Sequence, residues 1–289
     1  MQISQLYKKK KTVLSFEIFP PKKEADIQTI YSTIEQLKDL RPDFISVTYS
    51  AGGTGNGEKT AQIASLLKNE YGIESVAHLT CITADQEKIH ESIETLKKNG
   101  VENVLALRGD LPADFTGFKS YSYAKDLIAD IKQQGGMCIG AAAYPEGHID
   151  CVSMADNIAH LRQKVDAGAD FFLTQLFFDN AVFYNFLEKV RGAGIYTPIS
   201  AGVMPILGKQ QIQRMIFMCG ASLPSSIIKL LNKYENSPED LRKASIDYAA
   251  NQVRELIEYG VDGVHIYTMN QPDIARRQMQ IIRGETYAG

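Results

Sequence analysis

The segment TVLSFEIFP, residues 12–20, is a run of β-prone apolar residues that carries one carboxylate, Glu17, in its second half. Similar short runs recur along the chain, and the full set covers residues 12–20, 43–50, 74–82, 103–109, 137–145, 171–178, 198–205 and 263–270. Most are nearly continuous rather than alternating, which is typical of parallel strands covered on both faces. Stretches with helical periodicity separate most of them, at residues 27–40, 58–70, 85–99, 121–134, 154–167 and 180–193. The sequence therefore predicts a series of βα units.

The residues that follow the first run decide how these units assemble. Consecutive βα units either close into a barrel or form an open doubly wound sheet. An open sheet usually carries a glycine-rich phosphate loop after its first strand, whereas Phe19-Pro20-Pro21-Lys22 contains no glycine. We therefore predict an α/β fold, a (βα)8 TIM barrel formed by residues 1–289 as a single domain, with the open sheet as the alternative. The last interval between strands is nearly doubled, so residues 207–260 are expected to add extra helices before the last strand.

The composition narrows the class of protein. The formal net charge of −3 leaves no basic surface to hold nucleic acid or an anionic membrane, and the hydrophobic content of 44% is enough for a large core. The four cysteines are far apart and no H-E-x-x-H pair occurs, so neither a metal site nor a disulfide framework is expected. No apolar run is long enough to span a membrane and no signal peptide is visible, which predicts a cytoplasmic protein.

Two short patterns in the sequence do not indicate a function. Residues 52–60, GGTGNGEKT, come close to a P-loop, but Glu58 separates Gly57 from Lys59, so this segment is interpreted as a βα loop over the barrel mouth. The basic run at residues 8–11 is interpreted as the solvated end of a helix.

Polar residues at the carboxyl ends of barrel strands face the site of such a fold. Glu17 lies in a strand that should be buried on both faces, so we expect burial to raise its pKa and make it a general acid; the alternative is a structural ion pair across the barrel bottom. Arg108-Gly109-Asp110 could let backbone approach a ligand and offer a guanidinium to phosphate, or could simply begin a charged loop. Because these ends supply no nucleophile, Schiff-base lysine or metal, we expect a cofactor to carry the chemistry.

Nine short motifs, spread in order along nearly the whole chain, resemble those of the methylenetetrahydrofolate reductases. They are SFEIFPPK at residues 15–22, SVTY at 46–49, HLTC at 78–81, LRGD at 107–110, YPEGH at 144–148, KVDAGA at 164–169, TQLFFD at 174–179, GVMP at 202–205 and YTMN at 267–270. The resemblance is to the short bacterial type, which consists of the catalytic barrel alone.

This resemblance implies an FAD-dependent oxidoreductase of one-carbon metabolism and methionine synthesis. Such an enzyme uses NADH or NADPH to reduce 5,10-methylenetetrahydrofolate to 5-methyltetrahydrofolate by ping-pong hydride transfer. The resemblance implies that Glu17 helps to open the folate's five-membered ring, that the charge of Asp110 stabilises the resulting iminium, and that Gln175 binds the pterin. The implied flavin ligands are Thr48, Tyr49, Ala51, His78, Arg108, Gly109, Asp110, Ala124, Tyr144, His148, Asp156 and Lys164.

The chain departs from the family pattern in three places. Gln271 stands where the family prototype has an arginine that contacts folate, and Leu207, Gly208 and Lys209 lack an aromatic residue that stacks on the substrate. The resemblance therefore assigns no folate-tail contacts there. The segment between His148 and Asp156 is one residue shorter than the pattern.

Two other functions fit parts of the sequence. A related flavin barrel, such as a proline dehydrogenase-like oxidase, should lack the Phe-Glu-x-Phe-Pro-Pro strand. A non-enzymatic barrel that binds folate or flavin would gain little from a buried acid such as Glu17. The choice between NADH and NADPH has no dinucleotide fingerprint to decide it, and family precedent implies a homo-oligomer.

Overall fold

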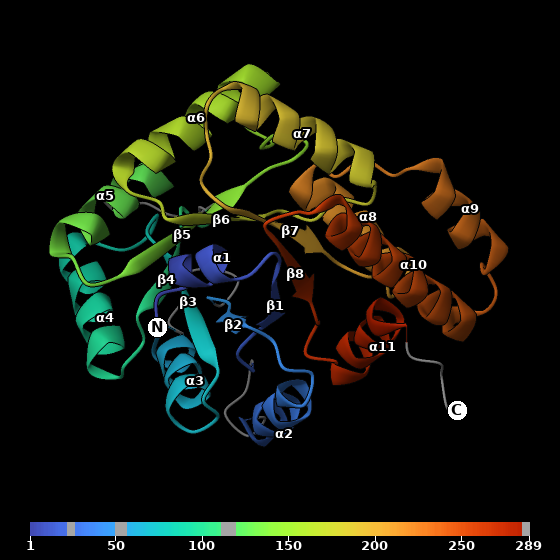
Figure 1. Ribbon diagram of the computed structural model, residues 1–289, viewed down its shortest axis with the longest axis horizontal. Coiled ribbons are helices and arrows are strands. Elements are labelled where there is room, and N and C mark those ends of the chain that lie inside the picture. The colour runs from blue at the N-terminus through green and yellow to red at the C-terminus, as the bar shows by residue number, and fades with distance from the viewer. Residues whose placement is uncertain (22–26, 50–56, 111–119, 285–289) are drawn as a thin grey trace.

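The chain folds into a closed barrel of parallel strands in the sequential order β1 to β8 (Figure 1). The computed structural model describes residues 1–21, 27–49, 57–110 and 120–284. The strands are β1 Val13–Ile18, β2 Phe44–Val47, β3 Glu74–Thr80, β4 Asn103–Leu107, β5 Cys138–Ala143, β6 Phe171–Thr174, β7 Ile199–Val203 and β8 Gly263–Tyr267. The predicted TIM barrel is confirmed, with each strand shorter than its apolar run.

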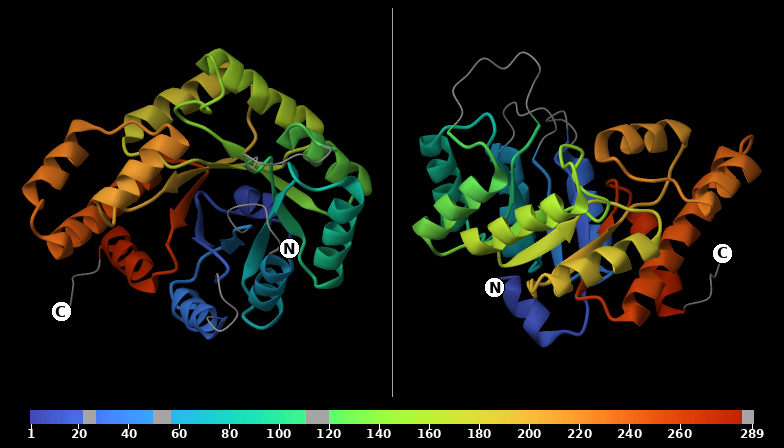
Figure 2. Two further views of the ribbon diagram at one scale, coloured as in Figure 1. Left: turned by 180° about the vertical axis from the view of Figure 1, so that it is seen from behind. Right: turned by 90° about the horizontal axis from the view of Figure 1, so that it is seen from above.

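Helices surround the barrel and follow the strands in turn (Figures 1 and 2). They are α1 Ser4–Lys9, α2 Ile27–Lys38, α3 Gly57–Asn69, α4 Gln86–Lys98, α5 Ala124–Gln134, α6 Met154–Ala167, α7 Asn180–Gly192, α8 Lys209–Cys219, α9 Ser225–Lys233, α10 Pro238–Tyr259 and α11 Pro272–Arg283. The extra helices expected before the last strand are α8, α9 and α10, and the basic run ends α1 with Lys8 and Lys9 in its last turn. No helix among the described residues is long and apolar enough to cross a membrane.

The inside of the barrel is filled by aromatic side chains at its amino-terminal end. Phe44 and Phe171 are fully buried, and their ring centroids lie 6.3 Å apart in an edge arrangement. The Phe171 ring fits because residue 140 is glycine: a Cβ atom at Gly140 would lie 2.5 Å from the Phe171 ring. Tyr7 of α1 packs against Phe171 from below, at 5.9 Å between centroids. The barrel interior is therefore a packed core rather than a channel.

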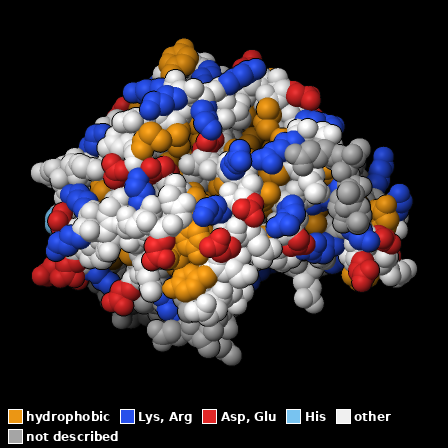
Figure 3. Space-filling view, turned by 60° about the horizontal axis from the view of Figure 1, so that its bottom comes forward, with side chains coloured by type: hydrophobic (Ala, Val, Ile, Leu, Met, Phe, Trp, Pro, Cys, Tyr) orange, Lys and Arg blue, Asp and Glu red, His pale blue; other side chains and the backbone are white. Residues whose placement is uncertain are grey.

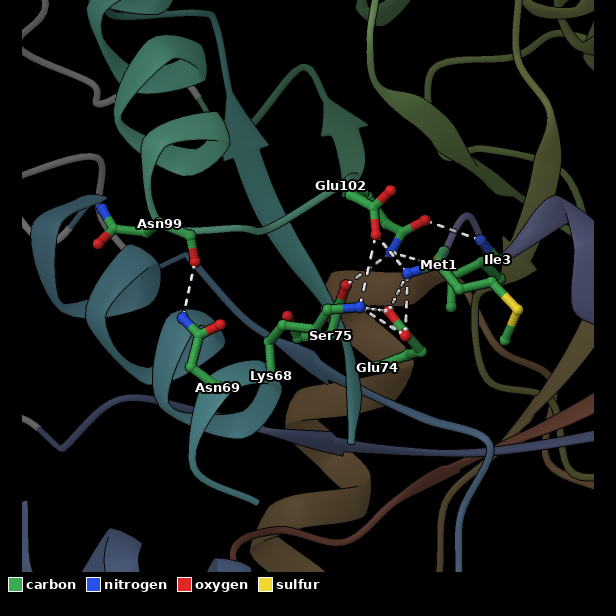
Figure 4. Close-up of polar contacts among 9 residues, drawn as sticks. Met1, Ile3, Lys68, Asn69, Glu74, Ser75, Asn99 and Glu102 are labelled. Atoms are coloured by element: carbon green, nitrogen blue, oxygen red, sulfur yellow. Dashed lines mark hydrogen bonds and ion pairs between the residues drawn. The ribbon is translucent and has the colours of Figure 1, made fainter. Parts of the chain in front are cut away.

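Helix α1 covers this lower end of the barrel (Figure 2). A polar cluster ties it down: the Met1 amino group contacts the carboxylates of Glu74 and Glu102, and Lys68 Nζ lies 2.6 Å from Glu74 Oε1 (Figure 4). The amide of Asn103 accepts a hydrogen bond from Ile3 N at 2.8 Å and donates one to Met1 O at 3.2 Å. These contacts hold α1 across the bottom, so among the described residues the lower end of the barrel is closed.

Helices α8 and α9 build a second layer at the mouth end of β6 and β7. Their inner faces pack through Ile212 and Ile227 onto Leu176, Phe178 and Met204, which follow those two strands. The face drawn in Figure 3 intersperses acidic and basic side chains without a patch of one sign, in keeping with the small net charge.

Candidate active site

A cavity of about 460 Å³ opens at the carboxyl ends of β4 and β5, where it is also bounded by the first turn of α5 and by α6. Its size falls in the range of about 300–1,000 Å³ that is typical of small-molecule and cofactor sites. The lining residues are Ala106, Leu107, Arg108, Tyr123, Ala124, Lys125, Ala142, Tyr144, His148, Asp150, Cys151, Asn157, His160, Leu161, Gln163 and Lys164. Arginine and lysine outnumber acids among them, so the cavity suits an anion.

Lys164 crosses from α6 to the floor of this cavity. Its ammonium donates a hydrogen bond to Ala142 O at 2.8 Å and lies 5.5 Å from the centroid of the Tyr144 ring. Burial lowers the pKa of Lys164 to about 8, since a charged ammonium loses hydration there. An anionic ligand would restore a favourable interaction for the charged form.

Tyr144 and His148 form the wall between Lys164 and the cavity mouth. Their rings meet edge to face with centroids 4.7 Å apart. Burial raises the pKa of Tyr144 to about 12, so its hydroxyl stays protonated and can donate a hydrogen bond. Burial also lowers the pKa of His148, which therefore presents a neutral imidazole near neutral pH.

Asp156, one of the expected flavin ligands, does not line this cavity. It is exposed in the first turn of α6, where Ser153 Oγ donates to its carboxylate at 2.7 Å and caps the helix by accepting from its backbone N–H at 3.2 Å. The next residue, Asn157, is buried, lines the cavity and donates from Nδ2 to Tyr144 O at 2.8 Å. A one-residue step on a helix turns a side chain by about 100°, so Asn157 faces the cavity while Asp156 faces solvent.

Glu17 lies apart from this cavity, inside the barrel near the carboxyl end of β1. One carboxylate oxygen, Oε2, is 3.5 Å from each of His78 Nε2, His265 Nε2 and Ser46 Oγ. On the far side of its ring, His265 Nδ1 lies 2.8 Å from Ser15 Oγ. This cluster, defined here as Ser15, Glu17, Ser46, His78 and His265, joins strands β1, β2, β3 and β8.

The pKa of Glu17 is lowered in this cluster, and the expectation of a raised value is wrong for the protein without a ligand. Burial acts in the expected direction, since it raises the pKa, but the hydrogen bond with His265 and the charges of the two histidines outweigh it. Glu17 keeps an exposed side-chain fraction of 18%, so water also reaches it from the mouth. Its contacts lie toward the mouth half of β1, which disfavours the alternative of an ion pair across the barrel bottom.

His78 is the least satisfied polar group of the cluster. Its side chain is 7% exposed, and Nε2 makes no hydrogen bond among the described residues, although it lies 3.5 Å from Glu17 Oε2. Burial lowers its pKa to about 4 in spite of the opposing effect of Glu17, so the ring is neutral at neutral pH. A buried imidazole nitrogen without a partner is costly unless a ligand completes it.

The other expected ligands lie in the segments just beyond the strands. Thr48 and Tyr49 follow β2, and the Tyr49 ring packs over Gly57 at the start of α3. Gln175 follows β6 and accepts a hydrogen bond from Leu176 N at 2.9 Å through Oε1. Asp110 is exposed just beyond β4. Ala51 lies outside the described residues.

Gly109 separates Arg108 from Asp110 and has a positive φ of +84°. A Cβ atom there would also lie 3.0 Å from Thr80 Cβ. Both constraints favour glycine, and they let the backbone of β4 turn sharply so that Arg108 faces the cavity while Asp110 lies beyond it.

Several residues of the site carried weak or no signals in the sequence. His265 and Ser46 stand inside apolar strands rather than at their ends, so their positions gave no signal. Ser15 could have been placed, because the alternation of side chains along β1 puts it on the same face as Glu17. Lys125, Cys151 and His160 come from helices and a loop, and only the folded cavity brings them together. No cluster of possible metal ligands occurs among the described residues.

These features define a class: a (βα)8 barrel with a cationic cavity and a carboxylate–histidine cluster at the carboxyl ends of its strands. The chain matches the methylenetetrahydrofolate reductase family over residues 2–282 and belongs to that family.

Relatives from bacteria and plants agree with this membership. The 5,10-methylenetetrahydrofolate reductases of Pectobacterium carotovorum subsp. carotovorum and Escherichia coli (strain K12) are 34% and 32% identical, and each match covers 91% of this chain and 87% or 88% of the relative. Methylenetetrahydrofolate reductase (NADH) 1 of Arabidopsis thaliana is 34% identical over 93% of this chain, but the chain spans only 48% of that protein.

A solved structure supports the fold. It is described as an uncharacterized protein from Clostridium thermocellum that binds two copies of 5-methyl-5,6,7,8-tetrahydrofolic acid. The TM-score is 0.68 with 16% identity, and the match covers 98% of both chains.

Proposed function

We propose that this protein reduces 5,10-methylenetetrahydrofolate to 5-methyltetrahydrofolate with NADH or NADPH, through bound FAD and by a ping-pong sequence. Family membership supports the reaction, and a neighbour of the same fold that binds 5-methyl-5,6,7,8-tetrahydrofolic acid supports a folate as the ligand. The observation that carries the proposal is the pairing of a cationic cavity over β4 and β5 with the Glu17 cluster across the same mouth. One part suits an anionic cofactor and the other suits proton transfer to a substrate.

The residues present fit FAD. Arg108 and Lys164 offer charge to its pyrophosphate, and the cavity gives concave, partly apolar space to its nucleoside part. Buried His78 Nε2, which makes no hydrogen bond among the described residues and lies 3.5 Å from Glu17 Oε2, is available to hydrogen-bond a ligand. We assign to FAD the residues Thr48, Tyr49, Ala51, His78, Arg108, Gly109, Asp110, Ala124, Tyr144, His148 and Lys164, with Asn157 in place of Asp156. Bound there, FAD would accept a hydride from the nicotinamide and pass it to the folate.

Glu17 is the proposed proton donor to the folate. Its Oε2 shares hydrogen bonds with His265 Nε2 and Ser46 Oγ, so a proton can be held between the carboxylate and the imidazole. A ligand that fills the mouth would exclude the water that now reaches Glu17, and the remaining burial would then raise its pKa toward that of a general acid. The ring-opened folate is a cation, and the negative charge of Asp110 would stabilise it, while Gln175 would bind the pterin.

The affinity for FAD is expected to fall as the pH rises through about 8. Below that pH Lys164 is charged both with and without ligand, so affinity is constant. Above that pH Lys164 is deprotonated in the free protein, whereas the bound pyrophosphate keeps Lys164 protonated. Binding therefore takes up a proton. The dissociation constant, measured by flavin fluorescence, should rise by up to about tenfold per pH unit. Lys164→Met should bind more weakly at pH 7 and lose this dependence, while Lys229→Met on α9 should keep it.

The colour of the flavin tests the proposed function directly. Purified protein should be yellow, NADH or NADPH should bleach it under anaerobic conditions, and 5,10-methylenetetrahydrofolate should restore the colour. Protein that takes up no FAD would refute the proposal. Protein that binds FAD but is bleached by neither nicotinamide would refute the proposed reaction and leave a flavin-dependent oxidase or a non-enzymatic binding barrel as the alternatives.

A further inference from the structure

Asp150 is the one carboxylate among the residues that line the described cavity. Its Oδ2 lies 3.2 Å from Arg108 Nη1 and 3.6 Å from His148 Nδ1. The backbone N–H of Asp150 donates to the same Nδ1 at 3.1 Å, so this nitrogen acts as an acceptor and cannot also donate to the carboxylate. The partner of the Asp150 carboxylate is therefore Arg108.

The ion pair between Asp150 and Arg108 is weak enough for a ligand to displace Asp150. The Arg108 side chain is 35% exposed and the Asp150 side chain 62% exposed, so water screens the attraction between them. Asp150 sits in a tight turn closed by Cys151 N to His148 O at 2.8 Å. Its neighbours Ile149 and Val152 are 64% and 96% exposed, and this turn therefore has little packing to lose when it shifts.

We propose that Asp150 is an internal competitor for anions, holding the Arg108 guanidinium until the pyrophosphate of a dinucleotide displaces it. This inference rests on the proposed function for the identity of the ligand. A planar guanidinium pairs with either a carboxylate or a phosphate in the same fork geometry. Asp150 thereby weakens the binding of pyrophosphate-containing ligands. The ligand has to displace Asp150 from Arg108, and its negative charge is repelled by the Asp150 carboxylate. An uncharged ligand meets neither effect, so its affinity does not depend on Asp150.

Asp150→Asn tests the proposal because it removes the charge and keeps the shape. FAD, ADP and riboflavin are each titrated into full-length protein freed of flavin by dialysis. The variant should bind FAD and ADP about three- to tenfold more tightly than the wild type, and riboflavin, which has no phosphate, with unchanged affinity. Asp166→Asn is the matched control, since Asp166 is exposed on α6 outside the cavity lining, and it should change none of the three affinities.

A second substitution shows whether the effect acts through Arg108. In an Arg108→Gln background, Asp150→Asn should give at most a small part of its gain, because the guanidinium that Asp150 occupies is gone. Equal affinities of the wild type and Asp150→Asn for both FAD and ADP would overturn the proposal, and so would an equal gain for riboflavin. If no protein takes up FAD but Asp150→Asn still gains affinity for ADP, the proposed cofactor is wrong while the competition by Asp150 stands.

Discussion

Glu17→Gln is expected to leave the reduction of the flavin by nicotinamide within a few-fold of the wild type and to slow the folate half-reaction by about 10²–10⁴-fold. Gln keeps the size of the side chain and its contacts with Ser46 and His265, but it cannot deliver a proton from Oε2. Hydride transfer from nicotinamide needs no such proton, so only the second half-reaction should depend on Glu17. Anaerobic stopped-flow absorbance separates the two: bleaching follows nicotinamide oxidation, and recolouring follows reduction of 5,10-methylenetetrahydrofolate.

A control substitution of the same kind, far from Glu17, tests whether the effect is specific to that position. Glu188→Gln, at an exposed position on α7, should alter neither half-reaction. If Glu17→Gln slowed both half-reactions equally, Glu17 would be supporting the fold or the flavin site and its assigned role as proton donor would be wrong.

Phe171→Ala is expected to lower the free energy of unfolding by about 3–5 kcal/mol, measured by urea denaturation. The ring is fully buried between Tyr7 of α1 and Phe44 of β2, so its removal leaves a cavity in the middle of the barrel. Tyr196→Ala removes an aromatic ring that is 76% exposed and should cost less than about 0.5 kcal/mol.

Gly140 offers a sharper test of the same packing. A methyl group at position 140 would meet the Phe171 ring at 2.5 Å, so Gly140→Ala alone should destabilise the protein by about 1–3 kcal/mol. In the double variant Gly140→Ala/Phe171→Ala the new methyl group occupies space that the Phe171 ring leaves. The double variant should therefore lose less free energy of unfolding than the two single variants together. Strictly additive losses would show that the two positions do not share this space.

The fold could be predicted because local signals repeat along the chain. Each strand is an apolar run, and glycines such as Gly168 and Gly260 end the helix before a strand in the left-handed conformation. The apolar runs extend beyond the true ends of the strands. The run at residues 171–178 predicts a longer strand than β6, which ends at Thr174. The backbone hydrogen bonds of the sheet stop where the barrel opens, but Leu176, Phe177 and Phe178 beyond that point remain buried. An apolar sequence therefore does not mark the end of the strand.

The site was less predictable because its properties come from residues distant in sequence. The lowered pKa of Glu17 depends on His265, which is 248 residues away and pairs with it only after the barrel closes. Asn157 lines the cavity and Asp156 does not, because the two side chains point to different sides of α6, and the motif in the sequence does not show which one faces inward. Asp150 gave no signal at all, because its significance comes from the cavity and from Arg108.

Because α1 covers the lower end of the barrel, the barrel is open at one end only among the described residues. Tyr7, Phe44 and Phe171 fill its base, and Glu17 lies above them, nearer the rim. Among the described residues the base is closed by packed side chains, so Glu17 faces the opening at the carboxyl ends of the strands. If both ligands of the proposed reaction use this opening, the nicotinamide has to leave before the folate can bind, as the proposed ping-pong sequence requires.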